Sequence, residues 1–457
     1  MNSTQHDNLI VIFGATGDLA LRKLLPALTR LSSGDALSGQ THVVAVGRRD
    51  FETADYLEYV HQNAPEKLDD KVLSNLVSYV KVAIDDPLSY RRLNDHVSAL
   101  SAKDAVTLYY FAVSPALFPG IAKGIHESGL VEKGDVTKRI IFEKPFGHGL
   151  ESARRINDAL YEAFDESQIY RIDHYLGKEM IQNLLTVRFA NRIFEEVWNN
   201  QTIKNVKIIV RETDGVLGRG AYYDSVGALS DMVQSHLLQM LSLVAMDTPL
   251  SYHSQDVKAE KLRVLENLSF DSSVSVFGQY EGYLEAADVK KDSDTETFVF
   301  LKALVNTPRF KGVPFYLMTG KKLEAKQSLI VVTFEETVEQ RKWKLPLSTN
   351  RLIIRVAPLD GVGLVLNSKV PGLRDAVEEV ELEYCSACRA VGNMPEAYEK
   401  LLLDAFEGHK SLFADWSEIE MSWRFVDSIR QTKHDLLVYK DHESLERRIK
   451  ELTDEVM

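Results

Sequence analysis

The chain has 457 residues, of which 45% are hydrophobic and 26% charged, and its formal net charge is −13. A single hydrophobic core stops growing at roughly 250–300 residues, so we expect two domains. The composition excludes disordered and collagen-like classes, and the negative charge opposes a general affinity for nucleic acid or anionic membrane. The polar N-terminus is not a signal peptide and no window approaches the roughly 20 apolar residues of a membrane span, so we expect a cytoplasmic protein.

The first third of the chain alternates short apolar runs with helical patterns. Leucines between residues 21 and 31 repeat at helical spacing, and a second amphipathic helix is expected around residues 156–164. Buried strands are expected at residues 9–13, 43–46, 108–113 and 139–142. This order predicts a parallel, doubly wound sheet, and we assign residues 1–172 to a Rossmann-type α/β domain.

From about residue 204 the apolar residues alternate with polar ones, which is typical of one-sided antiparallel strands. The strands are expected at 206–210, 298–301, 330–334, 352–356 and 380–384. Helices are expected at 231–246, 397–406, 418–429 and, as a solvated terminal helix, 441–455. Residues 173–457 are therefore predicted to form an α+β domain around a large, mainly antiparallel open sheet.

A glycine-containing turn between the first strand and the first helix is a candidate nucleotide site. Backbone N–H groups of such a turn can approach a pyrophosphate, and the helix N-terminus supplies partial positive charge. The full G-x-G-x-x-G spacing is absent, and a tight turn can need glycine for steric reasons alone. The residues of this turn are Gly14, Ala15, Thr16, Gly17, Asp18 and Leu19.

The second strand ends at Arg48, where an NAD enzyme usually places a carboxylate against the ribose 2′-hydroxyl. An arginine at this position favours the 2′-phosphate of NADP, and Thr16 is a possible additional donor. Lys144, in the sequence Glu143-Lys144-Pro145, follows a later strand at the sheet edge where ligands bind. The alternative, that Lys-Pro merely ends the strand, stays open on these residues.

The segment from Arg171 to Glu179 is rich in groups that can bind or transfer protons. If the segment is helical, His174 and Lys178 share a face and can converge on one anion, whereas Asp173 points about 100° away. An exposed helix with ordinary charges is the alternative.

Further along the chain, Asp231 opens the long apolar helix that contains His236. A histidine can accept a proton at neutral pH when a carboxylate holds its ring, although a lone histidine is more often a satisfied core residue. A run of lysines that includes Lys321 and Lys326 precedes a strand and is usually solvated surface. Cys385 and Cys388 form a single C-x-x-C that we interpret as incidental, and we predict no metal site.

Together these segments closely resemble the glucose-6-phosphate dehydrogenase family over almost the whole chain, and the nine residues from Arg171 to Glu179 are highly specific for it. Two departures are Ala221, where the family commonly has glycine, and a stretch at 385–393 that is shorter than the family loop. The other matching segments are 14–20, 143–147, 222–224, 227–229, 313–316, 320–321 and 369–372.

The resemblance implies oxidation of D-glucose 6-phosphate at C1 to 6-phospho-D-glucono-1,5-lactone with hydride transfer to NADP, the first oxidative step of the pentose phosphate pathway. His236 would be the general base and Asp173 the carboxylate that orients it. Substrate would be bound by Lys144, His174, Tyr175, Lys178, Glu212, Asp231, Lys321 and Lys326. The cofactor, NADP or more weakly NAD, would be bound by Gly14, Ala15, Thr16, Gly17, Asp18, Leu19, Arg48, Ala83, Ile84 and Lys144. Family members assemble through the large sheet, so a homodimer or homotetramer is expected.

Two other interpretations stay open at this point. Sugar dehydrogenases of the glucose-fructose oxidoreductase group share a Rossmann domain, a Glu-Lys-Pro motif and an open-sheet second domain, but mostly act on unphosphorylated sugars. A non-catalytic, cofactor-sensing protein is the third possibility, and it would be expected to lack the base or its orienting carboxylate.

Overall fold

The computed structural model describes residues 8–34, 37, 40–101, 105–343, 348–373, 376–385, 397–453 and 455. It divides into two compact units: unit 1 comprises residues 1–177 and 395–416, and unit 2 comprises residues 178–394 and 417–457. The division after Gly177 lies close to the boundary suggested by the sequence pattern at residue 172, and a second segment returns to unit 1 late in the chain. Cys388 lies outside the described residues. Within the described part of the chain, no helix combines the length and apolar character needed to cross a membrane.

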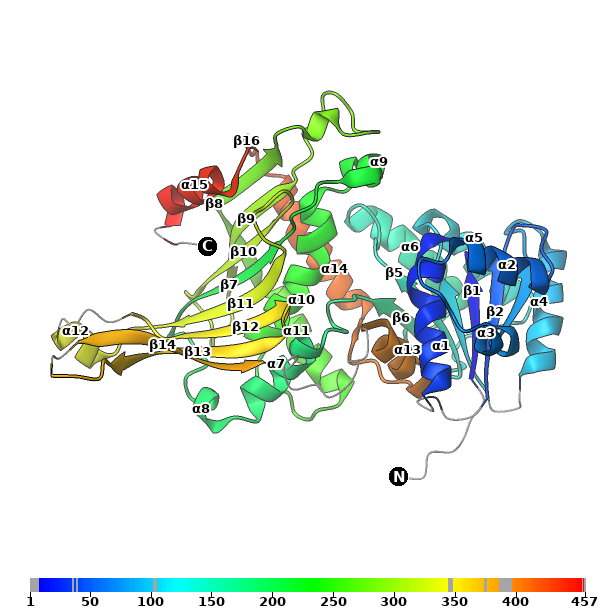
Figure 1. The fold of residues 1–457 in the computed structure, drawn as a ribbon, viewed down its shortest axis with the longest axis horizontal. Coiled ribbons are helices and arrows are strands. Elements are labelled where there is room, and N and C mark those ends of the chain that lie inside the picture. Colours follow the sequence, from blue (N-terminus) through cyan, green and yellow to red (C-terminus); the bar gives the residue numbers. More distant parts are fainter. Residues whose placement is uncertain are drawn as a thin grey trace. The chain divides into compact units, whose positions relative to one another are not determined.

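Unit 1 is built on a seven-stranded sheet of order β15-β6-β5-β4-β1-β2-β3, which confirms the Rossmann-type prediction (Figure 1). Every neighbouring pair is parallel except β15 with β6. The strands are β1 (Asn8–Phe13), β2 (Thr41–Gly47), β3 (Val77–Lys81), β4 (Val106–Phe111), β5 (Lys138–Glu143), β6 (Ile169–Ile172) and β15 (Phe413–Ala414). The central strands β1 and β4 are buried along their whole length, as expected for a sheet covered on both faces.

The helices of unit 1 pack on both faces of this sheet (Figure 1). They are η1 (Ala20–Leu24), α1 (Leu25–Ser33), α2 (Thr53–Asn63), α3 (Asp70–Leu76), α4 (Pro87–Leu100), η2 (Pro115–Leu117), α5 (Phe118–Glu127), α6 (Leu150–Ala163), η3 (Glu166–Gln168) and α13 (Ala397–Glu407). Helix α13 belongs here although its sequence follows the strands of unit 2, because Leu401, Leu402 and Ala405 join the core formed by β1 and α1. Arg139 of β5 donates to the carbonyls of Ala405 and Phe406 and so satisfies the C-terminal end of α13.

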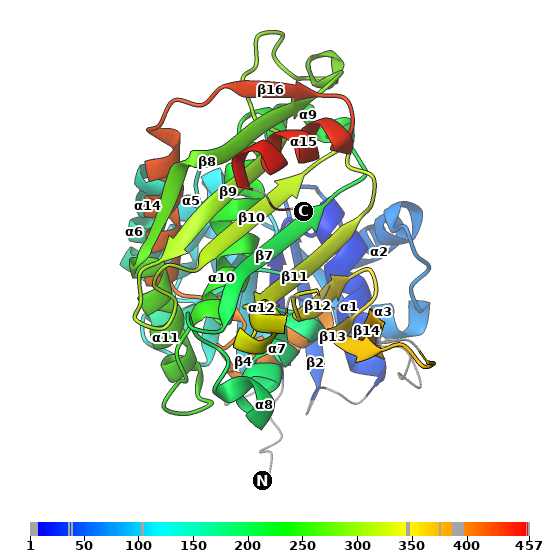
Figure 2. The same cartoon turned by 90° about the vertical axis from the view of Figure 1, so that its left-hand side faces the viewer.

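Unit 2 contains a nine-stranded sheet of order β14-β13-β12-β11-β7-β10-β9-β8-β16, seen face-on in Figure 2. The β7–β10 and β8–β16 pairs are parallel and the others are antiparallel, which confirms a large, mainly antiparallel sheet. The strands are β7 (Ile203–Arg211), β8 (Leu268–Tyr280), β9 (Phe298–Val305), β10 (Pro314–Gly320), β11 (Gln327–Phe334), β12 (Arg351–Ala357), β13 (Gly361–Lys369), β14 (Val377–Cys385) and β16 (Leu436–Tyr439). Of these, β8, β10, β13 and β16 were not expected from the sequence pattern.

Helices cover one face of the unit 2 sheet, and α15 lies on the opposite face (Figures 1 and 2). The elements are α7 (Glu179–Phe189), α8 (Arg192–Glu195), η4 (Leu217–Arg219), α9 (Gly220–Asp224), η5 (Leu229–Leu237), α10 (Leu238–Ala245), α11 (Ser254–Glu266), η6 (Tyr283–Glu285), α12 (Val338–Trp343), α14 (Trp416–Arg430) and α15 (His442–Thr453). The predicted helix at 231–246 is a π-helical segment, η5, followed directly by α10. Every residue of α10 is buried, in keeping with its almost wholly apolar sequence.

Candidate active site

The candidate residues of unit 1 follow the carboxyl ends of its parallel strands. Phe13 at the end of β1 faces Val46 of β2, and Glu143 at the end of β5 faces Ile172 of β6. The glycine turn, Arg48, Lys144 and Asp173 therefore leave the sheet at one edge. Ligands of open α/β sheets bind at this edge, so the register of the strands brings these four features into one region of unit 1.

The turn that follows β1 requires glycine at its first position. Gly14 has φ +84°, and a Cβ atom there would lie 2.4 Å from the carbonyl oxygen of Ala112. The N–H groups of Gly14 and Ala15 donate to the carbonyl of Val46 at 3.0 and 3.1 Å, and the Tyr56 hydroxyl donates to the carbonyl of Ala15. This fixed turn, comprising Gly14, Ala15, Thr16, Gly17, Asp18 and Leu19, leads straight into η1 and so meets the requirement for a phosphate-binding turn.

Replacing Gly14 with alanine is expected to strain this turn. The left-handed conformation costs a residue with a Cβ about 1–2 kcal/mol, so the melting temperature should fall by roughly 2–8 °C and cofactor affinity should fall with it. The control is Gly218→Ala, because a Cβ there would meet nothing within 4 Å. Thermal unfolding and NADP titration check both variants, and a Gly14→Ala protein that unfolds and binds NADP like the control would contradict the requirement.

The arginines after β2 have different surroundings. The Arg49 guanidinium lies 4.6 Å from the centre of the Tyr59 ring, and the Arg49 carbonyl accepts the Tyr79 hydroxyl. Arg48 is exposed, and no hydrogen bond or ion pair links it to another described residue. Arg48 can thus turn toward an anion without breaking an existing contact.

Ala83 and Ile84 lie beside the end of β2, because the N–H of Val82 donates to the carbonyl of Gly47 at 2.9 Å. Ile84 also lines a groove of about 380 Å³ along α4 and α5, together with charged side chains that include Lys123. The two residues are therefore placed where a nucleotide bound at the end of β2 could reach them.

The residues around Lys144 form a tight polar cluster. The neighbouring Glu143 accepts hydrogen bonds from the hydroxyls of Tyr110, at 2.9 Å, and Tyr398, at 2.6 Å. Burial raises the pKa of Glu143, while the two tyrosines and the Lys144 charge oppose the rise and the Asp173 charge adds to it. Glu143 was not among the predicted site residues, although it belongs to the Glu-Lys-Pro segment.

The segment that was considered as a helix is a turn. Asp173 follows the end of β6, and its carboxylate accepts the N–H of Tyr175 at 2.9 Å, while its carbonyl accepts the N–H of Leu176 at 3.0 Å. Lys178 has an extended backbone and precedes α7. The expected helix face shared by His174 and Lys178 is therefore absent, because the Asp173 side chain stabilises a turn at these residues. Asp173 is buried, and the His174 and Tyr175 rings lie 5.1 Å apart.

Within unit 2, Glu212 and Lys321 are held together by two adjacent parallel strands. Gly320 at the end of β10 faces Arg211 at the end of β7, so the residues that follow them are neighbours. The Lys321 ammonium group donates to the Glu212 carboxylate at 2.5 Å and lies 4.8 Å from the centre of the Tyr223 ring. Lys321 is buried, so this lysine is part of a polar cluster and does not belong to a solvated surface run.

The helix η5 carries Asp231 in its first turn and His236 near its end. His236 is completely buried. Burial, and to a smaller extent the charge of Asp231, raises the pKa of Tyr222 to about 12. Burial also raises the pKa of Tyr223, and the charges of Asp231 and Glu212 raise it further. These effects place Asp231 in the same region as the Glu212–Lys321 pair. The π-helical geometry, often found at functional sites, has no recognised sequence signal.

Two other lysines of unit 2 lie in different surroundings. Lys326 is exposed just before β11. Lys178 lies close to Asp360. Burial raises the pKa of Asp360, and the positive charge of Lys178 opposes this rise.

Tyr223, whose ring lies 4.8 Å from the Lys321 ammonium group, was not predicted as a site residue, although the matching segment at 222–224 was the available signal.

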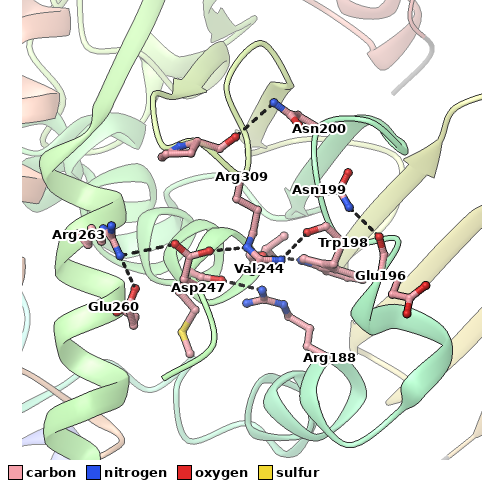
Figure 3. A network of polar contacts seen from close by, with 12 residues as sticks. Arg188, Glu196, Trp198, Asn199, Asn200, Val244, Asp247, Glu260, Arg263 and Arg309 are labelled. Carbon is pink, nitrogen blue, oxygen red and sulfur yellow. Dashed lines mark hydrogen bonds and ion pairs between the residues drawn. The ribbon is translucent and has the colours of Figure 1, made fainter. Parts of the chain in front are cut away.

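The C-terminal end of α10, the helix that continues directly from η5, is fixed by buried cationic and aromatic donors (Figure 3). Arg188 of α7 donates to the carbonyls of Leu243 and Met246 at 2.6 and 2.7 Å. The Trp198 indole N–H donates to the carbonyl of Val244 at 2.9 Å. These bonds satisfy the carbonyls that every helix leaves without an internal partner, and positive charge at this end is favourable to the helix dipole.

Comparison with known proteins gives matches along almost the whole chain. The family model "Glucose-6-phosphate dehydrogenase, NAD binding domain" matches residues 11–183, and "Glucose-6-phosphate dehydrogenase, C-terminal domain" matches residues 185–455. A glucose-6-phosphate 1-dehydrogenase of Bacillus subtilis is 39% identical over 447 residues, which cover 93% of this chain and 91% of that protein.

Solved structures agree with these matches. A glucose-6-phosphate dehydrogenase in complex with its substrate glucose-6-phosphate has a TM-score of 0.90 at 31% identity, covering 100% of this chain and 99% of that one. A glucose-6-phosphate 1-dehydrogenase from Mycobacterium avium has a TM-score of 0.85 at 33% identity, covering 96% of this chain and 94% of that one.

Proposed function

Because this chain belongs to the glucose-6-phosphate dehydrogenase family, we propose that it oxidises D-glucose 6-phosphate at C1 to 6-phospho-D-glucono-1,5-lactone and passes the hydride to NADP. This reaction is the first oxidative step of the pentose phosphate pathway. The observation that carries the proposal is the combination of a glycine turn and an exposed arginine in unit 1 with the Glu212–Lys321 pair and the buried His236 in unit 2.

We assign the proton transfer to His236, which would accept the C1 hydroxyl proton while the hydride leaves the same carbon. Asp173 would orient the imidazole and stabilise its protonated form. Burial of both side chains supports these roles, because a water-excluded base and carboxylate interact more strongly than exposed ones.

We assign substrate binding to two kinds of group. Glu212 and Asp231 would accept hydrogen bonds from sugar hydroxyls, as their position around Tyr223 allows. The cationic and aromatic groups would hold the phosphate and the ring, and these are Lys144, His174, Tyr175, Lys178, Lys321 and Lys326. A phosphate needs such local cations because the chain as a whole has a net charge of −13.

We propose that residues 1–172 form the cofactor-binding domain, with Lys144 also reaching the substrate, and that residues 173–457 bind substrate and carry the oligomer contacts. Bound NADP would supply the hydride acceptor. The chain would contribute the backbone N–H groups of the turn at residues 14–19 to the pyrophosphate, Arg48 and Thr16 to the 2′-phosphate, Ala83 and Ile84 to the nucleotide, and Lys144 near the reacting end.

Arg48→Ala should separate the two cofactors. Losing charge-assisted hydrogen bonds worth about 1.5–3 kcal/mol should weaken NADP binding roughly 10- to 100-fold and leave NAD binding within about threefold. Arg155→Ala on the exposed surface of α6 is the control. Initial rates over a range of each cofactor check the prediction, and equal losses with NADP and NAD would remove the assigned role.

Initial rates of NADPH formation test the proposed reaction against the sugar dehydrogenase alternative. Glucose 6-phosphate should be oxidised far faster than free glucose at equal concentration. Activity confined to free sugar would instead assign the chain to a different substrate class, and no activity with either sugar would favour a non-catalytic role.

We further propose a cytoplasmic homo-oligomer, a homodimer or a homotetramer, formed through the unit 2 sheet. The edge strand β14 supports this proposal, because it exposes Leu382 and Tyr384 between glutamates. Sedimentation of the purified protein would give the number of subunits, and cell fractionation would give the location.

A further inference from the structure

The N-terminal end of the π-helix η5 forms hydrogen bonds with Glu296. This residue and Thr297 directly precede β9. The Glu296 carboxylate accepts the N–H of Leu229, the first residue of η5, at 2.8 Å. The Glu296 carbonyl accepts the N–H of Ala228 at 3.0 Å. Two donors at the start of the helix, which have no acceptor within the helix itself, are thus satisfied by one residue.

The carboxylate can occupy this position because the neighbouring Gly227 has no side chain. A Cβ at Gly227 would lie 2.5 Å from Oε1 of Glu296, and Gly227 has φ +69°. Burial raises the pKa of Glu296, whereas the Leu229 N–H and the charge of Arg430 oppose the rise. A partly buried carboxylate in this place is favourable to the positive end of the helix dipole.

A second attachment comes from α14. The Arg430 guanidinium donates to the hydroxyl of Ser230, the second residue of η5. Arg430 is itself held by Asp427, at 3.3 Å, and lies 5.6 Å from the centre of the Trp423 ring. The first turn of η5 is therefore fixed from two directions.

Thr297 also holds the lysine of the candidate substrate site. The N–H of Lys321 donates to the carbonyl of Thr297 at 3.0 Å. The Tyr439 hydroxyl donates to the carbonyl of Lys321 at 2.6 Å and also lies 3.2 Å from the Thr297 hydroxyl. Residues 296 and 297 thus connect the helix that carries Asp231 and His236 to the Lys321–Glu212 pair.

From these contacts we infer that Glu296 is a positioning residue, which sets the depth and rotation of η5 so that Asp231 and His236 face the substrate together with Lys321. Glu296 would act through the helix, because its bonds are to the backbone N–H groups of Ala228 and Leu229. The inference rests on the proposed function, since it assigns Glu296 a part in placing the proposed base.

Three variants separate positioning from general stability. Glu296→Ala removes the acceptor for Leu229. Glu296→Gln keeps an oxygen acceptor of the same shape, so it should rescue the function. Glu418→Gln is the matched control, because it disrupts a buried ion pair of unit 2, Glu418 with Lys261 at 2.8 Å, at the opposite end of α14 from Arg430.

Kinetics with glucose 6-phosphate deuterated at C1 provide the first measurement. A misplacement of about 1 Å can cost as much as 100-fold in rate, so Glu296→Ala should lower kcat roughly 10- to 100-fold and increase the primary isotope effect. Glu296→Gln should stay within about threefold of the unchanged protein in kcat. Glu418→Gln should lower the amount of active enzyme and leave the isotope effect unchanged, and the affinity for NADP should change in none of the three.

Amide hydrogen exchange of the full chain provides a second measurement that does not depend on turnover. In Glu296→Ala, peptides covering residues 226–237 should exchange faster, while peptides from the unit 1 sheet keep their rates. If the unchanged protein fails to oxidise glucose 6-phosphate but this exchange pattern appears, the proposed function fails and the attachment of η5 stands. If Glu296→Ala retains full kcat, an unchanged isotope effect and unchanged exchange, the inference is overturned.

Discussion

His236→Asn should lower kcat by roughly 10²- to 10⁴-fold, because the reaction loses the group that accepts the C1 hydroxyl proton in the transition state. Asparagine has a similar shape but cannot take up a proton, so glucose 6-phosphate should still bind with nearly unchanged affinity. Steady-state kinetics and equilibrium binding of the substrate measure the two effects separately.

The matched control is His434→Asn. His434 belongs to the same unit, but its ring stacks on Phe277 at 3.9 Å, and its Nε2 lies 2.8 Å from the carbonyl oxygen of Ile429. This variant should keep its turnover. Survival of turnover within a few-fold in His236→Asn would place the base elsewhere in the protein.

Arg188→Met should produce the largest loss of stability, about 3–5 kcal/mol in the free energy of unfolding. Methionine fills a similar volume but leaves the carbonyls of Leu243 and Met246 without donors. Burial, together with the charge of Arg309, lowers the pKa of Arg188 to about 9, although the charge of Asp247 opposes this shift. Because this pKa is still above 7, the guanidinium stays charged at neutral pH. Urea unfolding measures the loss.

An exposed arginine of the same network provides the comparison for this prediction (Figure 3). Arg263 lies 3.6 Å from both Asp247 and Glu260, but its side chain is 54% exposed. Exposed ion pairs contribute about 0–1 kcal/mol, so Arg263→Met should change stability little. A loss of less than about 1 kcal/mol in Arg188→Met would show that the C-terminal end of α10 does not depend on this buried donor.

The sequence pattern predicts the two kinds of sheet because the periodicity of apolar residues differs between them. Continuous runs such as residues 9–13 became strands buried on both faces, and alternating stretches such as 352–356 became one-sided strands. Strand β8 escaped prediction because its first half is rich in serine and exposed residues, with an irregularity between Asp271 and Ser275. Strand β13 escaped because glycines interrupt its alternation.

Non-local packing explains other differences. Residues 397–406 show a helical pattern, and a helix is present, but nothing in its leucines indicates that α13 joins unit 1. The turn after β6 could have been predicted from the sequence. Asp173 can accept a hydrogen bond from the backbone two residues further on, and such a bond competes with the start of a helix.

The candidate site shows the same division between local and non-local information. The turn at Gly14 and the arginine at the end of β2 can be recognised from their neighbours in sequence. Glu212 and Lys321 are more than 100 residues apart, and they meet only because β7 and β10 pair in parallel, which the alternation of apolar residues does not specify. The resemblance to a family supplied these residues. Glu143 and Tyr223 lie in segments that match the family but were given no role, whereas Glu296 required the structure.

Deuterium tracing follows the transferred hydride from the sugar to the cofactor. Purified protein is incubated with NADP and glucose 6-phosphate deuterated at C1, and the reduced cofactor and the sugar product are analysed by mass spectrometry. We expect the deuterium to move to the nicotinamide ring of NADPH and the product to be the 6-phosphogluconolactone or its hydrolysis product. Unlabelled NADPH, with deuterium retained in the sugar, would contradict oxidation at C1.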